Sequence, residues 1–471
     1  MSSKTPDTEL WIRVENYNFD LPLCEYGLAT RLAKENCWTI AFTGKAISEY
    51  KKFMYLAAIS DQMVAPSPVI DIVWHEHIIF TQSYADFCMM IGKNIQHIPS
   101  VNSTRQTQSL IQSRKYTESF YTEHFGDLPS DIWKQPDMLA DLGLKQFKFK
   151  LKSVSLVIIL SALTLLVPIY HLLRPVYLRI NNPGFLINYW LLALCVVGLL
   201  EIYNRTVLKK LLTSIVSRSL IQNLKPEEVI YMQTGQLANV ISFSLDKLIK
   251  KQKLSIDENK LKIKNSETGD SVEEFTILET LRSSDKISYQ LLLTQLANKP
   301  CFTNIASSMD ALKKYIHKSA IFGRLFCINA VSFTTLITIA FMRYLTGISQ
   351  NKPVVLIFLS TLIAGILAIF FLYRLGKDLF ESALPDLTRR EILARRESDS
   401  VHNDWIYLLS GAAAVDASLL VLMEGPKGKR QPFDSDSRSS CFSGDSSGGD
   451  SHCSSGGDSS CSSCGGCGSS D

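Results

Sequence analysis

The sequence predicts a mainly α-helical membrane protein with four transmembrane helices in two pairs. A soluble helical domain precedes them, a small winged-helix-like α+β domain separates the pairs, and a disordered C-terminal tail closes the chain. Three observations predict this fold class. Four runs of about 18–20 apolar residues can each cross a hydrocarbon core of roughly 30 Å as a helix. Apolar residues before them recur at helical spacing, and the chain ends in Ser, Gly, Asp and Cys with almost nothing to bury.

Residues 1–145 are predicted to form the soluble helical domain. Apolar residues recur at helical spacing in Glu25–Trp38 and Ile40–Ser60. Ser67-Pro68 is a start signal for the next helix, because serine caps helix N-termini and proline is tolerated in the first turn. A further helix over Arg114–Phe125 should stop at Gly126. No strong strand signal appears in this domain.

Two transmembrane pairs are expected, over residues 154–203 and 325–373. The apolar runs are Val154–Leu173, Phe185–Tyr203, Leu325–Met342 and Val354–Tyr373. Lysine and arginine are denser outside the pairs than in the two short connections within them. Because cytoplasmic loops carry the excess of basic residues, we expect both termini and the middle region to be cytoplasmic. No ionisable residue lies at the centre of a run, which argues against a transport pathway.

Residues 204–320 should form the small cytoplasmic domain between the pairs. Pro226–Gln233 and Gln236–Lys251 are predicted helices, and residues 253–264 alternate apolar and polar side chains as in a β-hairpin. Two helices followed by a hairpin is the order of a winged helix. This element is basic, with Lys247, Lys250, Lys251, Lys253, Lys260, Lys262 and Lys264. These lysines could contact DNA, or they could form a solvated face beside an anionic membrane. A chain fixed in a membrane favours the second interpretation. We expect no nucleic-acid partner.

Residues 386–424 are predicted to be an amphipathic or packed helix, because Asp404 and Asp416 make a fifth span unfavourable. Residues 427–471 should be a disordered Ser/Gly/Cys-rich tail. It carries the thiols Cys441, Cys453, Cys461, Cys464 and Cys467. Their CxxC spacings suit soft metal ions, so metal capture, cysteine modification and plain flexibility remain open. The earlier cysteines have no paired spacing and are expected to be thiols in a reducing compartment; they are Cys24, Cys37, Cys88, Cys195, Cys301 and Cys327.

The segment Pro66–Pro99 carries the candidate site, because three of the eight histidines lie within it. Polar groups in an apolar helical segment are costly to bury unless they bind each other or a metal. The candidate residues are Asp71, Trp74, His75, His77, Tyr84, Cys88 and His97.

We expect Asp71–Met90 to be one helix, which separates these residues onto two faces. On one face, Asp71 stands one turn before His75 and can accept a hydrogen bond from its ring. The adjoining face carries His77, Tyr84 and Cys88. Positions i and i+2 of a helix point in different directions, so His75 and His77 should not both bind one ion.

The metal hypothesis therefore uses Asp71, His75 and His97, with His97 returning to the helix after the chain reverses at Gly92. Imidazole and carboxylate ligands suit zinc or iron. A structural hydrogen-bond network and direct acid–base catalysis are the alternatives, and the sequence leaves all three open.

A spaced motif runs through this segment as PS..ID..WH.H...T..Y..FC...G....H.P, from Pro66 to Pro99. With RLAKENCWT and ISEYKKFMYLA before it and YTEHFGDLPSDIW after it, the motif resembles the glycine-rich-domain-containing-protein-like family of plants, fungi and bacteria. The resemblance covers about residues 28–135 and implies an α-helical domain with a shared polar site, but no reaction. The remainder resembles uncharacterised bacterial multi-pass membrane proteins with a Gly/Cys-rich tail, which implies the bacterial inner membrane.

The sequence thus predicts a membrane-tethered binding or scaffold module that presents the helical domain and the cysteine tail to cytoplasmic protein partners. The lipid bilayer is its other partner. One alternative is a metal-dependent enzyme centred on Asp71, His75 and His97. Another makes the cysteine-rich tail a modified or metal-capturing segment.

Overall fold

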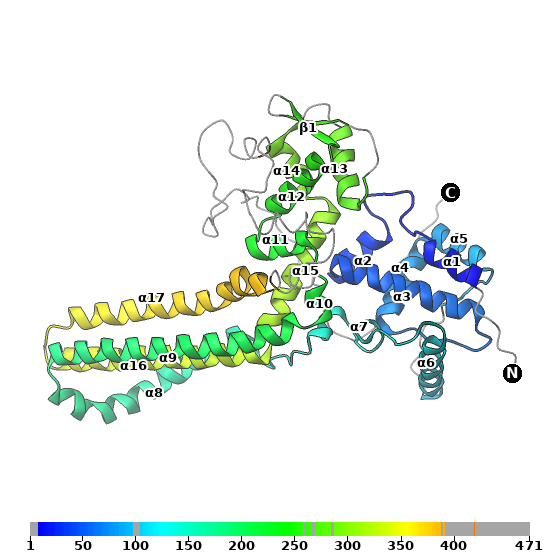
Figure 1. The fold of residues 1–471 in the computed structure, drawn as a ribbon. Helices are drawn as coiled ribbons and strands as arrows, with labels where there is room; N and C mark the ends of the chain where they lie inside the picture. Colours follow the sequence, from blue (N-terminus) through cyan, green and yellow to red (C-terminus); the bar gives the residue numbers. More distant parts are fainter. Residues whose placement is uncertain are drawn as a thin grey trace, which may run out of the picture. The chain divides into compact units, whose positions relative to one another are not determined.

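The computed structural model describes residues 8–97, 104–257, 260–264, 269–283 and 287–387, with Arg390 and Leu419. All of these belong to one compact unit of the chain, residues 1–437. The protein is mainly helical, as predicted, and the strands of the described part form one small sheet (Figure 1). Most of segment 386–424 and the whole tail 427–471, including its five thiols, lie outside the described residues.

The regular elements of the N-terminal region are all helices. Its elements are α1 (Thr8–Asn16), α2 (Leu28–Asn36), α3 (Ile40–Ile59), α4 (Pro68–Ile79), α5 (Thr81–Ile91), α6 (Thr104–Phe125), α7 (Ser130–Trp133) and the 3-10 helix η1 (Met138–Leu142). The expected boundary signals act as predicted. Ser67 accepts a hydrogen bond from the Ile70 amide at the start of α4. Gly126 follows α6 with φ of 81°, a left-handed conformation that glycine adopts without strain.

The prediction of one continuous helix over Asp71–Met90 is wrong. The chain leaves the helical conformation at Phe80 (φ −81°, ψ 67°), where α4 ends and α5 begins. No glycine or proline marks this position. Each helix buries its own apolar face against the same core, including Val73 on α4 and Phe87 on α5. Tertiary packing therefore sets this break, and local sequence does not.

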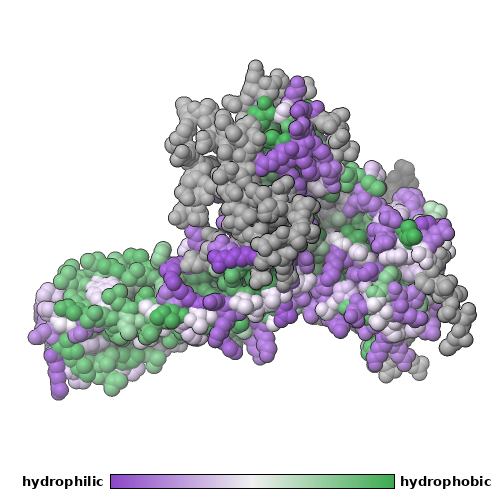
Figure 2. Space-filling model, in the orientation of Figure 1, coloured by the Kyte–Doolittle hydropathy of each residue, from purple (hydrophilic) through white to green (hydrophobic). Residues whose placement is uncertain are grey.

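Four helices are long and apolar enough to span a membrane. They are α8 (Leu151–Arg179), α9 (Asn182–Val216), α16 (Ala320–Ser349) and α17 (Val355–Asp378). Figure 2 shows an almost continuous hydrophobic surface over this part of the molecule. The most apolar stretch of α8 is 0% buried within the protein. Lipid chains can cover such a surface, whereas water would make it an aggregation hazard.

Polar side chains join the apolar helices to one another. Asn204 of α9 and Asn329 of α16 donate to each other's amide oxygens at 3.0 and 2.9 Å. Amide pairs of this kind hold helices together where no water competes. Arg343 lies beyond the predicted third run but within α16, and its guanidinium donates to the Ile180 carbonyl at 2.7 Å. That carbonyl lies at the end of α8, where the helix leaves carbonyls without internal partners.

The region between the pairs contains helices and the sheet. Its elements are α10 (Ser219–Gln222), α11 (Pro226–Thr234), α12 (Leu237–Lys250), β1 (Leu254–Asp257), β2 (Lys260–Ile263), α13 (Val272–Arg282), β3 (Ile287–Ser288), α14 (Tyr289–Ala297) and α15 (Pro300–His317). The predicted order of two helices and a hairpin is present. The strand β3 was not predicted; it extends the antiparallel sheet in the order β1-β2-β3.

Part of the basic charge near the hairpin is compensated by acidic neighbours. Lys251 pairs with Glu274 at 2.6 Å and with Asp270 at 2.9 Å. Lys253 is buried and pairs with Asp270 at 3.1 Å. Lys250 pairs with Asp246 on its own helix. These lysines therefore form ion pairs with carboxylates of the same domain. Fewer unpaired positive charges remain for contact with a nucleic-acid backbone.

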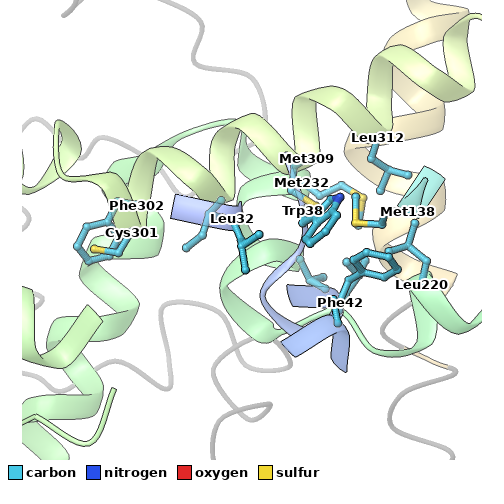
Figure 3. Packing of buried hydrophobic residues seen from close by; sticks show 14 of the residues in the cluster. Leu32, Trp38, Phe42, Met138, Leu220, Met232, Cys301, Phe302, Met309 and Leu312 are labelled. Carbon is cyan, nitrogen blue, oxygen red and sulfur yellow. The ribbon is translucent and has the colours of Figure 1, made fainter. Parts of the chain in front are cut away.

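The N-terminal region and the middle region share one hydrophobic core. Leu32, Trp38 and Phe42 lie in the same buried cluster as Met232 and Met309 (Figure 3). Two hydrogen bonds tie the regions together at the edge of this cluster. The Ile40 amide donates to Glu228 Oε1 at 2.8 Å, and the Asn304 side chain donates to the Thr30 carbonyl at 2.9 Å. The predicted soluble domains are therefore packed into one body.

The scattered cysteines are mostly thiols, as expected. Those found free are Cys24, Cys88, Cys195, Cys301 and Cys327. Cys37 is not among these free thiols. Burial raises the pKa of Cys301 to about 12, which keeps this thiol protonated and unreactive near neutral pH.

Candidate functional site

The candidate residues lie on α4, on α5 and on the segment that follows α5. The first turn of α4 is stabilised by the Ser67 cap and by Pro68 at its start. Trp74 and His77 lie on the buried side of α4 and pack into the N-terminal core, whereas His75 faces solvent. The helix thus has one solvent-facing and one buried set of polar groups.

Asp71, His75 and His97 form the exposed set, and the structure brings these three predicted residues together. One potential ligand atom from each lies within 4.8 Å of the other two. His97 Nε2 is 3.0 Å from Asp71 Oδ1, and His75 Nδ1 is 3.5 Å from Asp71 Oδ2. The side chains of Asp71 and His75 are 40% and 55% exposed, whereas His97 is 14% exposed. The cluster is therefore open to solvent on one side.

One ring nitrogen of His75 is already engaged by the backbone. Its Nδ1 donates to the main-chain carbonyl of Asp71 at 2.9 Å. In the neutral imidazole this tautomer places the lone pair on Nε2. Metal-binding histidines commonly donate their second nitrogen to a carbonyl or carboxylate in this way, because the contact orients the ring.

The segment after α5 returns His97 to α4. Gly92 ends α5 with φ of 72°, and this left-handed conformation reverses the chain as predicted. Lys93 then donates to the Ala57 and Ser60 carbonyls at 2.8 and 2.9 Å. The His97 ring packs edge-on against Trp74, with 4.6 Å between ring centroids.

Trp74 and Tyr84 connect the exposed set to the core. The Trp74 indole N–H donates to the Tyr84 hydroxyl at 3.1 Å, and that hydroxyl donates to the Ile95 carbonyl. Ile95 lies two residues before His97, so its contact with Tyr84 fixes the returning segment against α4. Cys88 lies buried next to Tyr84 and adds to the burial of this region.

His77 belongs to the buried set and does not join the exposed cluster. Its Nδ1 is 2.8 Å from the Tyr50 hydroxyl and its Nε2 is 3.2 Å from the Ser83 hydroxyl. Burial lowers the pKa of His77 to about 4, so the ring is neutral near pH 7. The expectation that His75 and His77 do not share one ion agrees with this geometry.

Sequence reasoning missed a buried carboxylate on α3. Glu49 accepts hydrogen bonds from the Tyr121 hydroxyl at 2.8 Å and the Trp133 indole at 2.9 Å, and it pairs with Lys52 at 2.8 Å. The signal was present, since Glu49 falls on the helix face that also carries Ala46. With its partners all inside the domain, this carboxylate stabilises the packing of α3, α6 and α7.

A second missed residue is Glu76, between the two histidines of the WHEH element. It pairs with Arg31 of α2 at 2.5 Å. The pair joins α2 to the solvent-facing edge of α4 beside the exposed cluster. It therefore helps to position the helix that carries Asp71 and His75.

Comparison with known proteins bears on only part of the chain. Residues 19–122, which include every candidate residue on α4 and α5 and His97, match the family described as UCP032817-like, an uncharacterised family. No curated protein and no solved structure matches the chain. The comparisons lend no support to the glycine-rich-domain name of the resemblance. What they establish is that residues 19–122 are similar to the UCP032817-like family.

Proposed function

We propose that this protein is a membrane-tethered cytoplasmic binding module whose helical domain binds a divalent transition metal through Asp71, His75 and His97. The observation that carries the proposal is the convergence of one potential ligand atom from each residue within 4.8 Å. Two imidazoles and one carboxylate form a ligand set that both Zn²⁺ and Fe²⁺ accept.

The surroundings of the three side chains support metal binding. Zn²⁺ holds nitrogen and oxygen ligands at about 2.0–2.1 Å, so the ligand atoms must move closer together around an ion. Asp71 and His75 are exposed enough to rotate. His97 is held against Trp74, and the Nδ1 of His75 already donates to a carbonyl. One ligand is thus held in place, and the ring of His75 must turn for its unprotonated Nε2 to reach an ion bound by Asp71 and His97.

The tether consists of the four apolar helices, each long enough to span a membrane. The density of lysine and arginine outside the helix pairs supports cytoplasmic termini, and the bacterial inner membrane is the location that the sequence resemblance favours. We propose a relationship of residues 28–135 to the glycine-rich-domain-containing-protein-like family on its motif alone. Cytoplasmic proteins are the proposed partners of the exposed domain and tail.

Metal content of the full-length protein tests the proposal. All five tail cysteines are first replaced by serine, so that metal captured by the tail is not counted. The purified protein is stripped with a chelator, reloaded with Zn²⁺ or Fe²⁺, and measured by elemental mass spectrometry. We expect one equivalent per chain, with loss of binding in His75→Ala and His97→Ala. His124→Ala, which removes a histidine of α6 outside the cluster, is the matched control and should keep the metal.

The same contacts also form a hydrogen-bond network without metal, and this alternative predicts a different result. In that case the reloaded wild-type protein stays metal-free, while His97→Ala lowers the melting temperature because the Asp71 contact is lost. Metal retained in both His75→Ala and His97→Ala would also refute the proposed ligands. Comparing proteins with and without the tail thiols shows separately whether the tail captures metal.

A metal-dependent enzyme is the second candidate function. It is favoured by the exposure of Asp71 and His75, because three protein ligands on an open surface leave a coordination position for water or substrate. Co²⁺ substitution tests for that position. Addition of azide should change the visible spectrum of the Co²⁺ protein if the position is open, and a closed binding site should leave the spectrum unchanged.

A further inference from the structure

A groove of about 350 Å³ lies between α9 and α17, far from the metal-site candidates in the sequence. Its polar rim includes Arg205, Lys209 and Arg374, and its apolar wall includes Leu208, Phe371 and Leu375. The groove therefore combines basic and apolar surfaces in a space large enough for part of a small amphipathic molecule.

The groove lies where two candidate spans leave the hydrocarbon region. The second predicted apolar run ends at Tyr203 and the fourth at Tyr373, and Arg205 and Arg374 follow almost at once. Exposed apolar side chains precede both ends, including Ile202 at 66% and Phe370 at 61% exposure. Phe371 precedes the end of the fourth run, so a lipid chain can meet the apolar wall there, while a headgroup can meet the basic rim.

A carboxylate organises the basic rim. Glu201 Oε1 accepts hydrogen bonds from Arg205 at 2.6 Å and from Arg374 at 3.1 Å. The shared oxygen holds a guanidinium from α9 and one from α17 on the same side of the groove. Lys209 is exposed one turn beyond Arg205. Three cations and one carboxylate leave a net positive rim, which suits a phosphate group.

We propose that this groove binds an anionic phospholipid. The headgroup phosphate lies against Arg205, Lys209 and Arg374, and one acyl chain covers Phe371 on the membrane side of the groove. Basic pockets between transmembrane helices at the cytoplasmic face are a recurrent form of anionic-lipid recognition. The proposal is independent of the metal site, since the two share no residue.

Lipid binding by the full-length protein in detergent micelles tests the proposal. Phosphatidylglycerol and phosphatidylcholine are added separately, bound lipids are counted by native mass spectrometry, and melting temperatures are recorded. We expect phosphatidylglycerol to bind more tightly and to raise the melting temperature more. Lys209→Gln should weaken phosphatidylglycerol binding about five-fold, since each basic residue near an anionic headgroup contributes on the order of 1 kcal/mol.

Two further variants make the test specific. Glu201→Gln removes the negative charge but keeps an oxygen that can accept from Arg205 and Arg374, so it should tighten phosphatidylglycerol binding. Lys152→Gln removes an exposed lysine at the start of α8, outside the groove, and should leave binding unchanged. Equal binding of the two lipids, or equal losses in Lys209→Gln and Lys152→Gln, would overturn the proposal. Inorganic phosphate should not displace the lipid; displacement would point to a free-phosphate site instead.

Discussion

At the scale of single residues, burial separates two histidines that stand only two positions apart. His75 is 55% exposed on its side chain and contacts Asp71, whereas His77 is fully buried between Tyr50 and Ser83. A buried imidazole loses the hydration of its charged form, which explains the lowered pKa of His77. Only the exposed ring therefore remains available to an ion from solution.

Glu228 is a second residue whose surroundings decide its chemistry. It is fully buried, and its two carboxylate oxygens accept hydrogen bonds from the Ile40 and Lys225 amides, each at 2.8 Å. It thereby caps the N-termini of α3 and α11 at once. Burial raises its pKa from 4.5 to about 7, against the opposing effect of these hydrogen bonds.

Glu228→Gln should change how stability depends on pH. Since the pKa of Glu228 is higher in the folded than in the unfolded protein, the folded state binds more protons between pH 4.5 and about 7. Its contribution to the unfolding free energy is therefore most favourable below pH 4.5 and is lost as pH rises to about 7. We expect the variant to lack this decline when full-length melting temperatures are measured across that range.

An amide offers only one acceptor oxygen to the two N–H donors of Ile40 and Lys225, so the variant will be less stable at every pH. The result that tests the prediction is therefore the slope of melting temperature against pH. Glu279→Gln removes an exposed acid of α13 and should keep the wild-type slope. Parallel melting curves for wild type and Glu228→Gln across the whole range would show that Glu228 does not titrate there.

At the scale of elements, the exposed cluster depends on the break between α4 and α5 and on the return of the chain after Gly92. The break at Phe80 turns α5, and the reversal carries His97 to Asp71. Neither helix alone holds all three metal-site candidates. Tyr84 positions the returning segment, because its hydroxyl contacts both Trp74 and the Ile95 carbonyl.

Tyr84→Phe should weaken metal binding while leaving the helices intact. Loss of the hydroxyl frees the segment that carries His97, and residues that orient metal ligands typically affect affinity by about 10–100-fold. Competition with a coloured chelator measures the Zn²⁺ affinity of the full-length variant, and circular dichroism checks its fold. Tyr26→Phe, with its long 3.4 Å contact to Glu35, is the control. An unchanged affinity in Tyr84→Phe would contradict this positioning role.

At the scale of the whole molecule, the helical domain and the middle region fold as one body. Trp38 is 2% exposed and lies with Met232 and Met309 from the middle region (Figure 3). α2 packs against α15, and Asn304 donates to the Thr30 carbonyl across this contact. The domain with the exposed cluster is thereby tied to the segment that connects the two pairs of apolar helices.

Residues 1–145 expressed alone should be less stable than in the full chain. Removing the middle region exposes Leu32, Trp38 and Phe42, which lie in the shared core. We expect the fragment to bind an apolar fluorescent dye and to melt at a lower temperature. Co-expression with residues 204–320 should reduce dye binding. A fragment that melts sharply and binds no dye would show that the shared core is dispensable.

The apolar helices, several helix boundaries and the members of the exposed cluster were predictable because each depends on local signals. Length and composition identify a span, Ser67 and Gly92 mark helix ends, and Asp71 stands one turn before His75. The break at Phe80, the strand β3 and the role of Glu49 were not predicted. Each depends on packing against segments distant in the sequence.

The sequence by itself therefore determined the class of protein: four apolar helices, a helical domain before them, and a set of polar residues in Pro66–Pro99. Only the tertiary structure decided which of those residues meet. It separated His77 from His75, brought His97 to Asp71, and joined the soluble regions through one core. The physical reason is that hydrophobic periodicity and caps act within a few turns of chain, whereas burial and ligand geometry depend on contacts between distant segments.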